Sequence, residues 1–166
     1  NIYPDSEPDE MVVMDIHKAF QFGSSAHADQ LRSSGQPYFT HCVSVGVKLS
    51  EWCLDPDTII AGILHDTLED TDVSKEVLQE EFNPEIAKLV EGVSKLSDIK
   101  FRSREQKQAE NFMKMFLSVA NDIRVIIIKF ADRLHNMKTI EHLPRIKQHR
   151  IAKETRDVFA PLAHRL

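Results

Sequence analysis

The sequence predicts an all-α fold, a helical bundle, in a single domain. Only five glycines occur in 166 residues, and apolar residues mostly recur three or four positions apart, as on one face of a helix. Runs that alternate between apolar and polar residues, as half-buried strands do, are nearly absent. A chain of this length can bury a substantial core without disulfides.

The first part of the chain is predicted to contain two helices joined by a loop. Apolar residues at helical spacing predict a helix over about residues 9–28. The serine, glycine and proline content of residues 31–38 predicts a loop. A second helix is expected from about Thr40 to Glu51, and it carries His41 near its start.

Three further helices are expected in the middle of the chain. Asp55-Pro56 is a favourable helix start, because proline fits the first turn. The helix that follows is expected to run to about residue 68, with the His65-Asp66 pair at its C-terminal end. Helices over about 74–82 and 85–96 come next.

The last part of the chain is expected to hold a polar loop and two long helices. Residues 97–104 are polar and basic, as in an exposed loop, and helices follow over about 105–120 and 122–136. The apolar run 125–128 also fits a strand. Its continuity with the residues after it favours a buried helix.

Bulk properties narrow the classes of function. The formal net charge of −5 argues against non-specific nucleic-acid binding, and no apolar run reaches the ~18 residues of a membrane span. Cys42 and Cys53 lack a metal-binding CxxC spacing, so reduced thiols in a cytoplasmic protein are expected. The chain starts at Asn1 and ends at Leu166 without a polar tail, so we expect it to be part of a longer protein.

The most informative segment is HDTLED at residues 65–70, which directly follows the apolar run 59–64. Placing four ionisable side chains beside a buried segment costs free energy unless their charge is offset. Histidine nitrogens and carboxylate oxygens suit Mn²⁺, Fe²⁺, Co²⁺ or Zn²⁺. A bound divalent cation and a purely structural polar network would both meet the requirement.

Two residues elsewhere in the chain complete a candidate ligand set. His41 stands at the start of a predicted helix, and Asp132 lies in a very apolar stretch where an unpaired charge is costly. With the His-Asp pair they form a set of two histidines and two aspartates. Each also has a structural alternative: a buried histidine is more often a hydrogen-bonded core residue, and Asp132 could pair with Lys129 or Arg133.

Other polar residues have candidate roles beside this set. Glu69 and Asp70 could orient a metal's water and take its proton, or they could form a solvated acidic helix end. Asn136 lies one turn after Asp132, and Thr139 lies nearly one turn further, so both could contact a sugar or phosphate. Arg32, beside the small-residue loop, could contact a phosphate or a base. Exposed polar residues at these positions are the structural alternative.

The charge distribution favours the metal. Residues 66–91 hold nine acidic side chains against only Lys75 and Lys88. A phosphorylated substrate would be repelled by this surface unless a cation reversed the local field. Phosphoester chemistry at this site would therefore require a metal.

A histidine, a His-Asp pair and a later aspartate resemble the pattern of the HD superfamily of metal-dependent phosphohydrolases. Longer segments are similar to the hydrolase domain of RelA/SpoT-type alarmone enzymes, and they cover essentially residues 10–166. These segments are QLRSSGQPY (30–38), HDTLED (65–70), EGVSKL (91–96), AENF (109–112), ADRLHNM (131–137), ET (154–155) and APLAHRL (160–166).

The resemblance implies Mn²⁺-dependent hydrolysis of the 3′-pyrophosphate of (p)ppGpp, which yields GDP or GTP and pyrophosphate. It implies a synthetase domain in cis, with this chain as the N-terminal hydrolase half, and neither membrane binding nor direct nucleic-acid binding by this domain. The implied site residues are the metal ligands His41, His65, Asp66 and Asp132, the catalytic carboxylates Glu69 and Asp70, and the substrate contacts Arg32, Ser33, Ser34, Asn136 and Thr139.

One position departs from the family. Ser33 stands where family loops usually have lysine, which removes a cation from the nucleotide pocket. The His-Asp and Glu-Asp pairs are intact, so an active hydrolase is the main hypothesis. Two alternatives stay open: a catalytically silent HD module that regulates a synthetase, and an HD phosphohydrolase that acts on another nucleotide.

Overall fold

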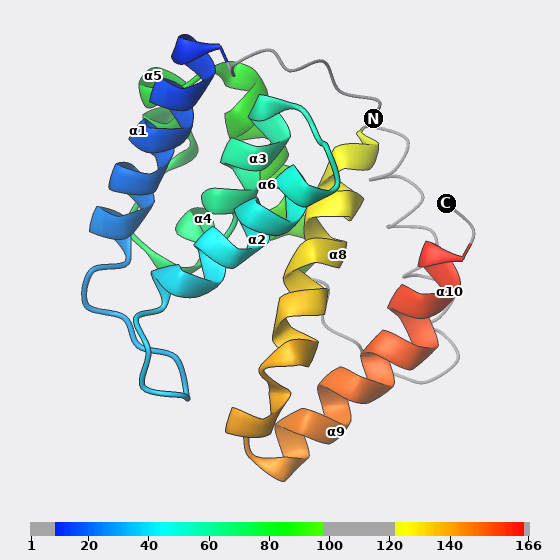
Figure 1. Ribbon diagram of the computed structural model, residues 1–166. Helices are drawn as coiled ribbons and strands as arrows, with labels where there is room; N and C mark the ends of the chain where they lie inside the picture. The colour runs from blue at the N-terminus through cyan, green and yellow to red at the C-terminus, as the bar shows by residue number, and fades with distance from the viewer. Residues whose placement is uncertain (1–8, 98–121, 165–166) are drawn as a thin grey trace.

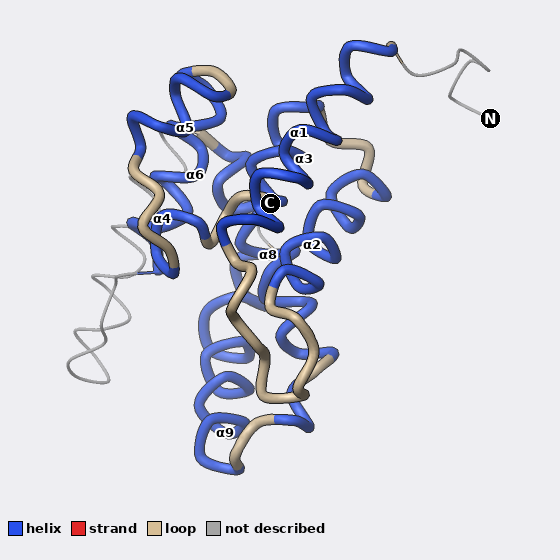
Figure 2. Tube along the Cα trace, turned by 90° about the vertical axis from the view of Figure 1, so that its left-hand side faces the viewer, coloured by secondary structure: helices blue, strands red, loops and turns tan. Residues whose placement is uncertain are grey.

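The computed structural model describes residues 9–97 and 122–164, and this part of the chain is built from helices and the loops between them (Figures 1 and 2). The all-α prediction is therefore confirmed for these residues. Two of the elements are not α-helices: η1 (Ile140–His142) is a 3₁₀ helix and η2 (Thr155–Phe159) is a π-helix. The elements are α1 (Glu10–Ala26), α2 (Phe39–Glu51), α3 (Pro56–Ile63), α4 (Thr67–Asp70), α5 (Lys75–Glu81), α6 (Pro84–Ser97), α8 (Ile123–Lys138), η1 (Ile140–His142), α9 (Arg145–Glu154), η2 (Thr155–Phe159) and α10 (Ala160–Ala163).

Side-chain caps explain where several helices begin. Asp55 accepts a hydrogen bond from the backbone amide of Thr58 (3.1 Å) at the start of α3. Ser74 caps α5 in the same way through the amide of Val77 (3.4 Å).

The predicted helix over 105–120 and the predicted loop after residue 97 lie outside the described residues.

One predicted helix boundary is wrong. The helix expected to reach residue 68 ends at Ile63, because the backbone turns at Leu64 and a separate helix begins at Thr67. The hydroxyl and the amide of Thr67 both donate to the carbonyl of Leu64 (2.7 and 3.0 Å), which replaces the bond that a continuous helix would make there. His65 and Asp66 therefore lie in the turn between α3 and α4.

The core is enclosed by four helices: α2 and α6 each pack against both α3 and α8. Helices α2 and α3 approach closely at glycine, since a Cβ added to Gly62 would lie only 2.2 Å from Cδ1 of Leu49. The apolar run 125–128 is helical as predicted, and Val125, Ile126 and Ile128 are buried. This packing holds the start of α2, the turn after α3 and the middle of α8 in fixed positions.

The C-terminal helices form an arm beside α8 (Figure 1). A small apolar cluster of Ile126 and Leu162 attaches α10. The guanidinium of Arg133 lies 4.2 Å from the ring centroid of Phe159. Helix α9 has no buried residue, so its sequence carries no apolar stripe from which a helix could be predicted.

Within the described ranges, none of the helices combines the length and apolarity that crossing a membrane requires.

Candidate metal centre and adjoining pocket

The four predicted metal ligands converge at one point in the core. Nε2 of His41 lies 3.3 Å from Oδ1 of Asp132 and 3.7 Å from Oδ2 of Asp66. Nε2 of His65 lies 2.9 Å from Oδ2 of Asp66 and 4.0 Å from Oδ1 of Asp132. Potential ligand atoms of His41, His65 and Asp132 all fall within 4.8 Å of one another. Helix α2, the α3–α4 turn and helix α8 thus supply one cluster.

The hydrogen bonds of His65 show that the cluster fits a cation. Its Nδ1 donates to the carbonyl of Gly62 (2.9 Å), so in the neutral ring Nε2 carries a lone pair. The side chain is fully buried, and Nε2 has no hydrogen-bond partner although carboxylate oxygens are near. A lone pair and carboxylate oxygens repel one another, whereas a divalent cation would attract all of them. The residues present therefore fit a divalent metal.

The electrostatics of the cluster agree with this fit. Burial would raise the pKa of Asp66, but the neighbouring histidines, His65 first and then His41, together hold that pKa well below its ordinary value. Burial opposes ionisation of Asp132 too, and Lys129 with the two histidines keeps its pKa low. Burial alone would lower the pKa of His65, yet the negative charge of Asp66 raises it. Two ionised carboxylates thus favour positive charge at this point.

Asp132 has further partners that hold its carboxylate in place. Nζ of Lys129 lies 3.3 Å from Oδ2, so the structural pairing considered from the sequence occurs alongside the histidine contact. Nδ2 of Asn136 donates to Oδ1 (2.5 Å). Arg133 points elsewhere and pairs with Glu154 (3.1 Å). One carboxylate oxygen therefore faces Lys129, and the other faces the histidines.

Tyr38 joins two of the predicted functional carboxylates. Its hydroxyl donates to Oδ2 of Asp66 (2.7 Å) and lies 3.0 Å from Oδ2 of Asp70. Burial, followed by the charge of Asp66, raises the pKa of Tyr38, so the phenol stays protonated and able to donate. Asp70 at the end of α4 is thereby tied to the metal cluster, as a group close to the reaction would be.

Glu69 lies at the exposed edge of the same region. Its partial burial raises its pKa, against the opposing effects of Ser97 and Lys129. A carboxylate with a raised pKa is a stronger base than an ordinary one. Glu69 and Asp70 are consecutive on α4, one turn past the His65-Asp66 pair.

Sequence reasoning did not single out three side chains that contact the cluster. Tyr38 and His135 belong to motifs quoted for the family resemblance, but their partners are not visible from the sequence. Nδ1 of His135 lies 2.8 Å from Nδ1 of His41, and burial lowers the pKa of His135 to about 4. The buried thiol of Cys42 forms a second group of possible ligands with His65 and Asp66.

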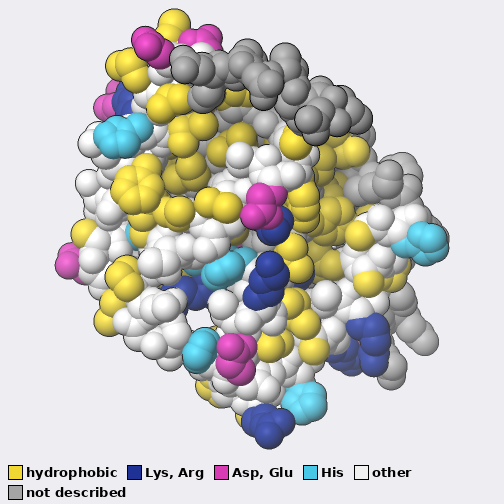
Figure 3. Space-filling view, viewed as in Figure 1, with side chains coloured by type: hydrophobic (Ala, Val, Ile, Leu, Met, Phe, Trp, Pro, Cys, Tyr) yellow, Lys and Arg dark blue, Asp and Glu magenta, His cyan; other side chains and the backbone are white. Residues whose placement is uncertain are grey.

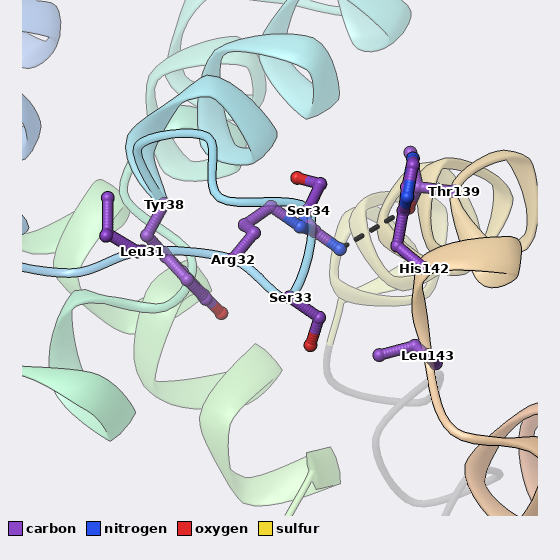
Figure 4. A pocket seen from close by; sticks show the side chains of 8 residues that line it. All are labelled: Leu31, Arg32, Ser33, Ser34, Tyr38, Thr139, His142 and Leu143. Carbon is purple, nitrogen blue, oxygen red and sulfur yellow. Dashed lines mark hydrogen bonds between the residues drawn. The ribbon is translucent and has the colours of Figure 1, made fainter.

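A pocket of about 200 Å³ adjoins the metal cluster (Figure 4). The loop after α1 contributes Arg32, Ser33 and Ser34, and the end of α8 contributes Thr139. Nη2 of Arg32 donates to Oγ1 of Thr139 (3.5 Å), and Figure 4 shows this arginine reaching across the pocket. The full lining is Leu31, Arg32, Ser33, Ser34, Tyr38, Thr139, His142 and Leu143.

The pocket loop owes its shape to a tight turn. Leu31 and Pro37 form an antiparallel bridge, and Gly35 adopts a positive φ of 83° that favours glycine. The amide of Gly35 donates to the carbonyl of Arg32 (2.8 Å). This turn presents the Arg32 side chain toward α8.

Asn136 links the pocket to the metal cluster. Its Oδ1 accepts from Nη2 of Arg32 (2.9 Å), while its Nδ2 donates to Asp132. Nη1 of Arg32 is buried without a hydrogen-bond partner, so it can still donate to a ligand. Four of the five predicted substrate contacts line the pocket, and the fifth, Asn136, lies behind it. On the face seen in Figure 3, most basic side chains lie in the lower half, and hydrophobic side chains gather above them.

This helical fold, with two histidines and two aspartates at its centre, defines a metal-dependent HD-type domain. The HD domain family model matches residues 19–166, and the chain belongs to the HD domain family. The family resemblance found in the sequence motifs is thereby confirmed. HD domains bind divalent metals, in agreement with the fit of the cluster.

Particular relatives are similar over nearly the whole chain. A Synechocystis protein named probable guanosine-3′,5′-bis(diphosphate) 3′-pyrophosphohydrolase is 54% identical over 151 residues, which are 91% of this chain and 20% of that protein. The bifunctional (p)ppGpp synthase/hydrolase SpoT of Escherichia coli K12 is 48% identical over 151 residues, 91% of this chain and 22% of SpoT. The chain thus spans about a fifth of the length of these relatives.

A solved structure is similar in fold as well. This structure is of a metazoan ortholog of SpoT that hydrolyses ppGpp and plays a role in starvation responses. It is 25% identical to this chain, covers 92% of it, and is itself covered to 85%, with a TM-score of 0.72. The arrangement of helices around the site is therefore shared with that protein.

Proposed function

We propose that this chain hydrolyses the 3′-pyrophosphate of (p)ppGpp to GDP or GTP and pyrophosphate, with Mn²⁺ as the metal. The observation that carries the proposal is the hydrogen-bonded connection from Arg32 through Asn136 to Asp132. A free donor, Nη1 of Arg32, at one end of this connection and the proposed metal ligand Asp132 at the other support binding of a phosphorylated nucleotide. The names of the relatives support the choice of nucleotide.

In this proposal His41, His65, Asp66 and Asp132 hold the metal ion. When bound, a divalent cation supplies Lewis-acid polarisation of a phosphoryl oxygen and makes a nearby water more acidic. A hard cation such as Mn²⁺ suits the two carboxylates, and the two imidazoles complete the proposed ligand set.

The remaining residues have separate parts in the reaction. Hydrolysis adds the hydroxyl of water to phosphorus and a proton to the 3′ oxygen that leaves. Glu69 accepts the proton of the attacking water, because burial raises its pKa and makes it a stronger base than an ordinary carboxylate. Asp70, held by Tyr38, orients that water. Arg32 with Ser33, Ser34 and Thr139 binds the nucleotide in the pocket.

We further propose that the chain is a hydrolase unit, residues 1–166, within a longer protein that carries a synthetase domain in cis. The support is that the relatives are more than four times as long as this chain and that one of them is named for both activities. Both cysteines are free thiols, which supports a cytoplasmic location. Neither a membrane nor nucleic acid is a partner in this proposal.

Turnover in the presence and absence of metal tests the proposal. The protein is incubated with ppGpp, ppApp and deoxynucleoside triphosphates, with Mn²⁺ or with chelator, and release of pyrophosphate and phosphate is followed. We expect Mn²⁺-dependent release of pyrophosphate from ppGpp. Absence of this turnover would contradict the proposal, and equal turnover of all nucleotides would indicate a different HD phosphohydrolase.

Arg32→Ala tests the pocket within the same assay. Losing hydrogen bonds from a charged group costs about 1.5–3 kcal/mol, so KM for ppGpp should rise about 10- to 150-fold. Mn²⁺ affinity should stay unchanged. The matched control is Arg156→Ala, because Arg156 is exposed, pairs with Asp157 and does not line the pocket. An unchanged KM in Arg32→Ala would show that the nucleotide binds elsewhere.

A further inference from the structure

The two metal-binding histidines are oriented in different ways. His65 donates from Nδ1 to a backbone carbonyl, that of Gly62, which can only accept a hydrogen bond. Nδ1 of His41 instead faces Nδ1 of His135 at 2.8 Å, with the two ring centroids 4.8 Å apart. An imidazole nitrogen can either donate or accept. The Gly62 carbonyl therefore fixes the tautomer of His65, whereas His135 by itself does not fix the tautomer of His41.

Two ring nitrogens at this separation share a single proton. If that proton is on His135, Nδ1 of His41 accepts, and the neutral His41 ring carries its own proton on Nε2. Nε2 then has no lone pair for a metal, although it faces Asp132 at 3.3 Å. If the proton is on His41, Nδ1 donates to His135 and Nε2 is free to bind. Metal binding by His41 thus requires His135 to accept.

We propose that His135 is a positioning residue that holds His41 in the tautomer able to bind the metal. The inference rests on the proposed metal site. Side chains that orient metal-binding histidines typically change metal affinity or activity by about 10- to 100-fold when they are replaced.

The placement of His135 on α8 supports this role. Asp132, which contacts His41 directly, lies three residues earlier on the same helix, and Asn136, which orients Asp132, lies one residue later. One helical turn of α8 therefore supplies a metal ligand and the orienting groups of two ligands. Any shift of α8 against α2 would disturb all of them together.

Two substitutions separate hydrogen bonding from packing. His135→Asn keeps an acceptor, since the amide oxygen of asparagine can take the place of Nδ1, while His135→Leu fills space without one. We expect Mn²⁺ affinity, measured by titration calorimetry on the whole chain, to fall about 10- to 100-fold in His135→Leu. His135→Asn should restore most of it. The control His149→Leu, an exposed histidine on α9, should bind as the wild type does.

The outcomes distinguish this inference from the proposed function. If wild-type protein does not bind Mn²⁺, the metal site itself is wrong. If the wild type binds and His135→Leu binds equally well, or if asparagine restores nothing in a folded protein, the role of His135 alone is refuted. Nitrogen-15 spectra of protein loaded with diamagnetic Zn²⁺ give a second readout: we expect His135 unprotonated at Nδ1 and His41 protonated there. The reverse pattern would overturn the inference.

Discussion

Replacing Asp132 by asparagine removes a charge from the centre of the metal cluster while keeping the size of the side chain. In the wild type this carboxylate lies 3.3 Å from Nε2 of His41 and 3.3 Å from Nζ of Lys129, whose side chain is only 14% exposed. Removing one partner of a buried ion pair costs about 3–5 kcal/mol. The remaining amide can still form hydrogen bonds, so we expect the metal-free variant to lose about 3 kcal/mol of unfolding free energy.

The larger difference is in the response to metal. A ligand that binds only the folded state adds about 2.7 kcal/mol when its free concentration is 100 times Kd. For a protein of this size each kcal/mol raises Tm by about 2–4 °C, so Mn²⁺ should raise the wild-type Tm by about 5–11 °C. If losing Asp132 weakens binding about 100-fold, the same Mn²⁺ concentration equals Kd and adds only about 0.4 kcal/mol, or about 1–2 °C.

Thermal unfolding followed by circular dichroism, in chelator and at one fixed Mn²⁺ concentration, measures both effects. The matched control is Asp57→Asn, since Asp57 is a half-buried carboxylate that accepts from the side chain of Asn83 (3.3 Å) outside the cluster. This control should keep the full wild-type response to Mn²⁺. If Asp132→Asn is stabilised by Mn²⁺ as strongly as the wild type, Asp132 is not a metal ligand.

Three further changes have defined outcomes. Glu69→Gln should lower kcat about 10²- to 10⁴-fold without changing Mn²⁺ affinity, and a wild-type rate in this variant would exclude Glu69 from the chemistry. In the wild type, kcat/KM should fall on acidification at a pH above the ordinary carboxyl pKa. The reason is that burial raises the pKa of Glu69 and that only its ionised form accepts a proton. Tyr38→Phe should lower activity about 10- to 100-fold in pyrophosphate release, because the hydroxyl that joins two carboxylates is lost, and an unchanged rate would leave that hydroxyl a structural role only. Gly62→Ala should cost about 1–3 kcal/mol in urea unfolding, because its Cβ would overlap Leu49, whereas an unchanged midpoint would mean that α2 and α3 can separate without cost.

The metal ligands could be predicted because charged residues in an apolar context are unusual. His65 and Asp66 directly follow a buried helix, and Asp132 lies on a helix whose buried residues are Val125, Ile126, Ile128 and Ala131. Such charges need compensation wherever the chain places them, so the sequence indicates these residues as candidate ligands while a structural polar role stays open.

The side chains that orient those ligands could not be predicted in the same way. Tyr38 and Asp66 are 28 residues apart in the sequence, and His41 and His135 are 94 residues apart. A tyrosine or a histidine is common in a partly buried position, so neither residue signals a partner by itself. Only the packing of α8 against α2 shows which nitrogen His135 faces.

Helix boundaries show a similar limit. Apolar content predicted that the helix from Asp55-Pro56 would continue through the His65-Asp66 pair. The hydroxyl of Thr67 competes for the carbonyl of Leu64, and this local hydrogen bond ends α3 earlier. Helix α9 was not predicted at all, because it buries no residue and its sequence therefore shows no apolar periodicity.

The supply of metal ligands from α2, the α3–α4 turn and α8 has a consequence for the order of events during synthesis. Three of the four ligands are present once Asp66 has been made, but Asp132 follows 66 residues later. At about 5–20 residues per second, a growing chain carries an incomplete site for about 3–13 s. During that interval the histidines and Asp66 lack α8, against which α2 later packs. Under the proposed ligand assignment, we therefore expect metal to be loaded only once the helical core is complete.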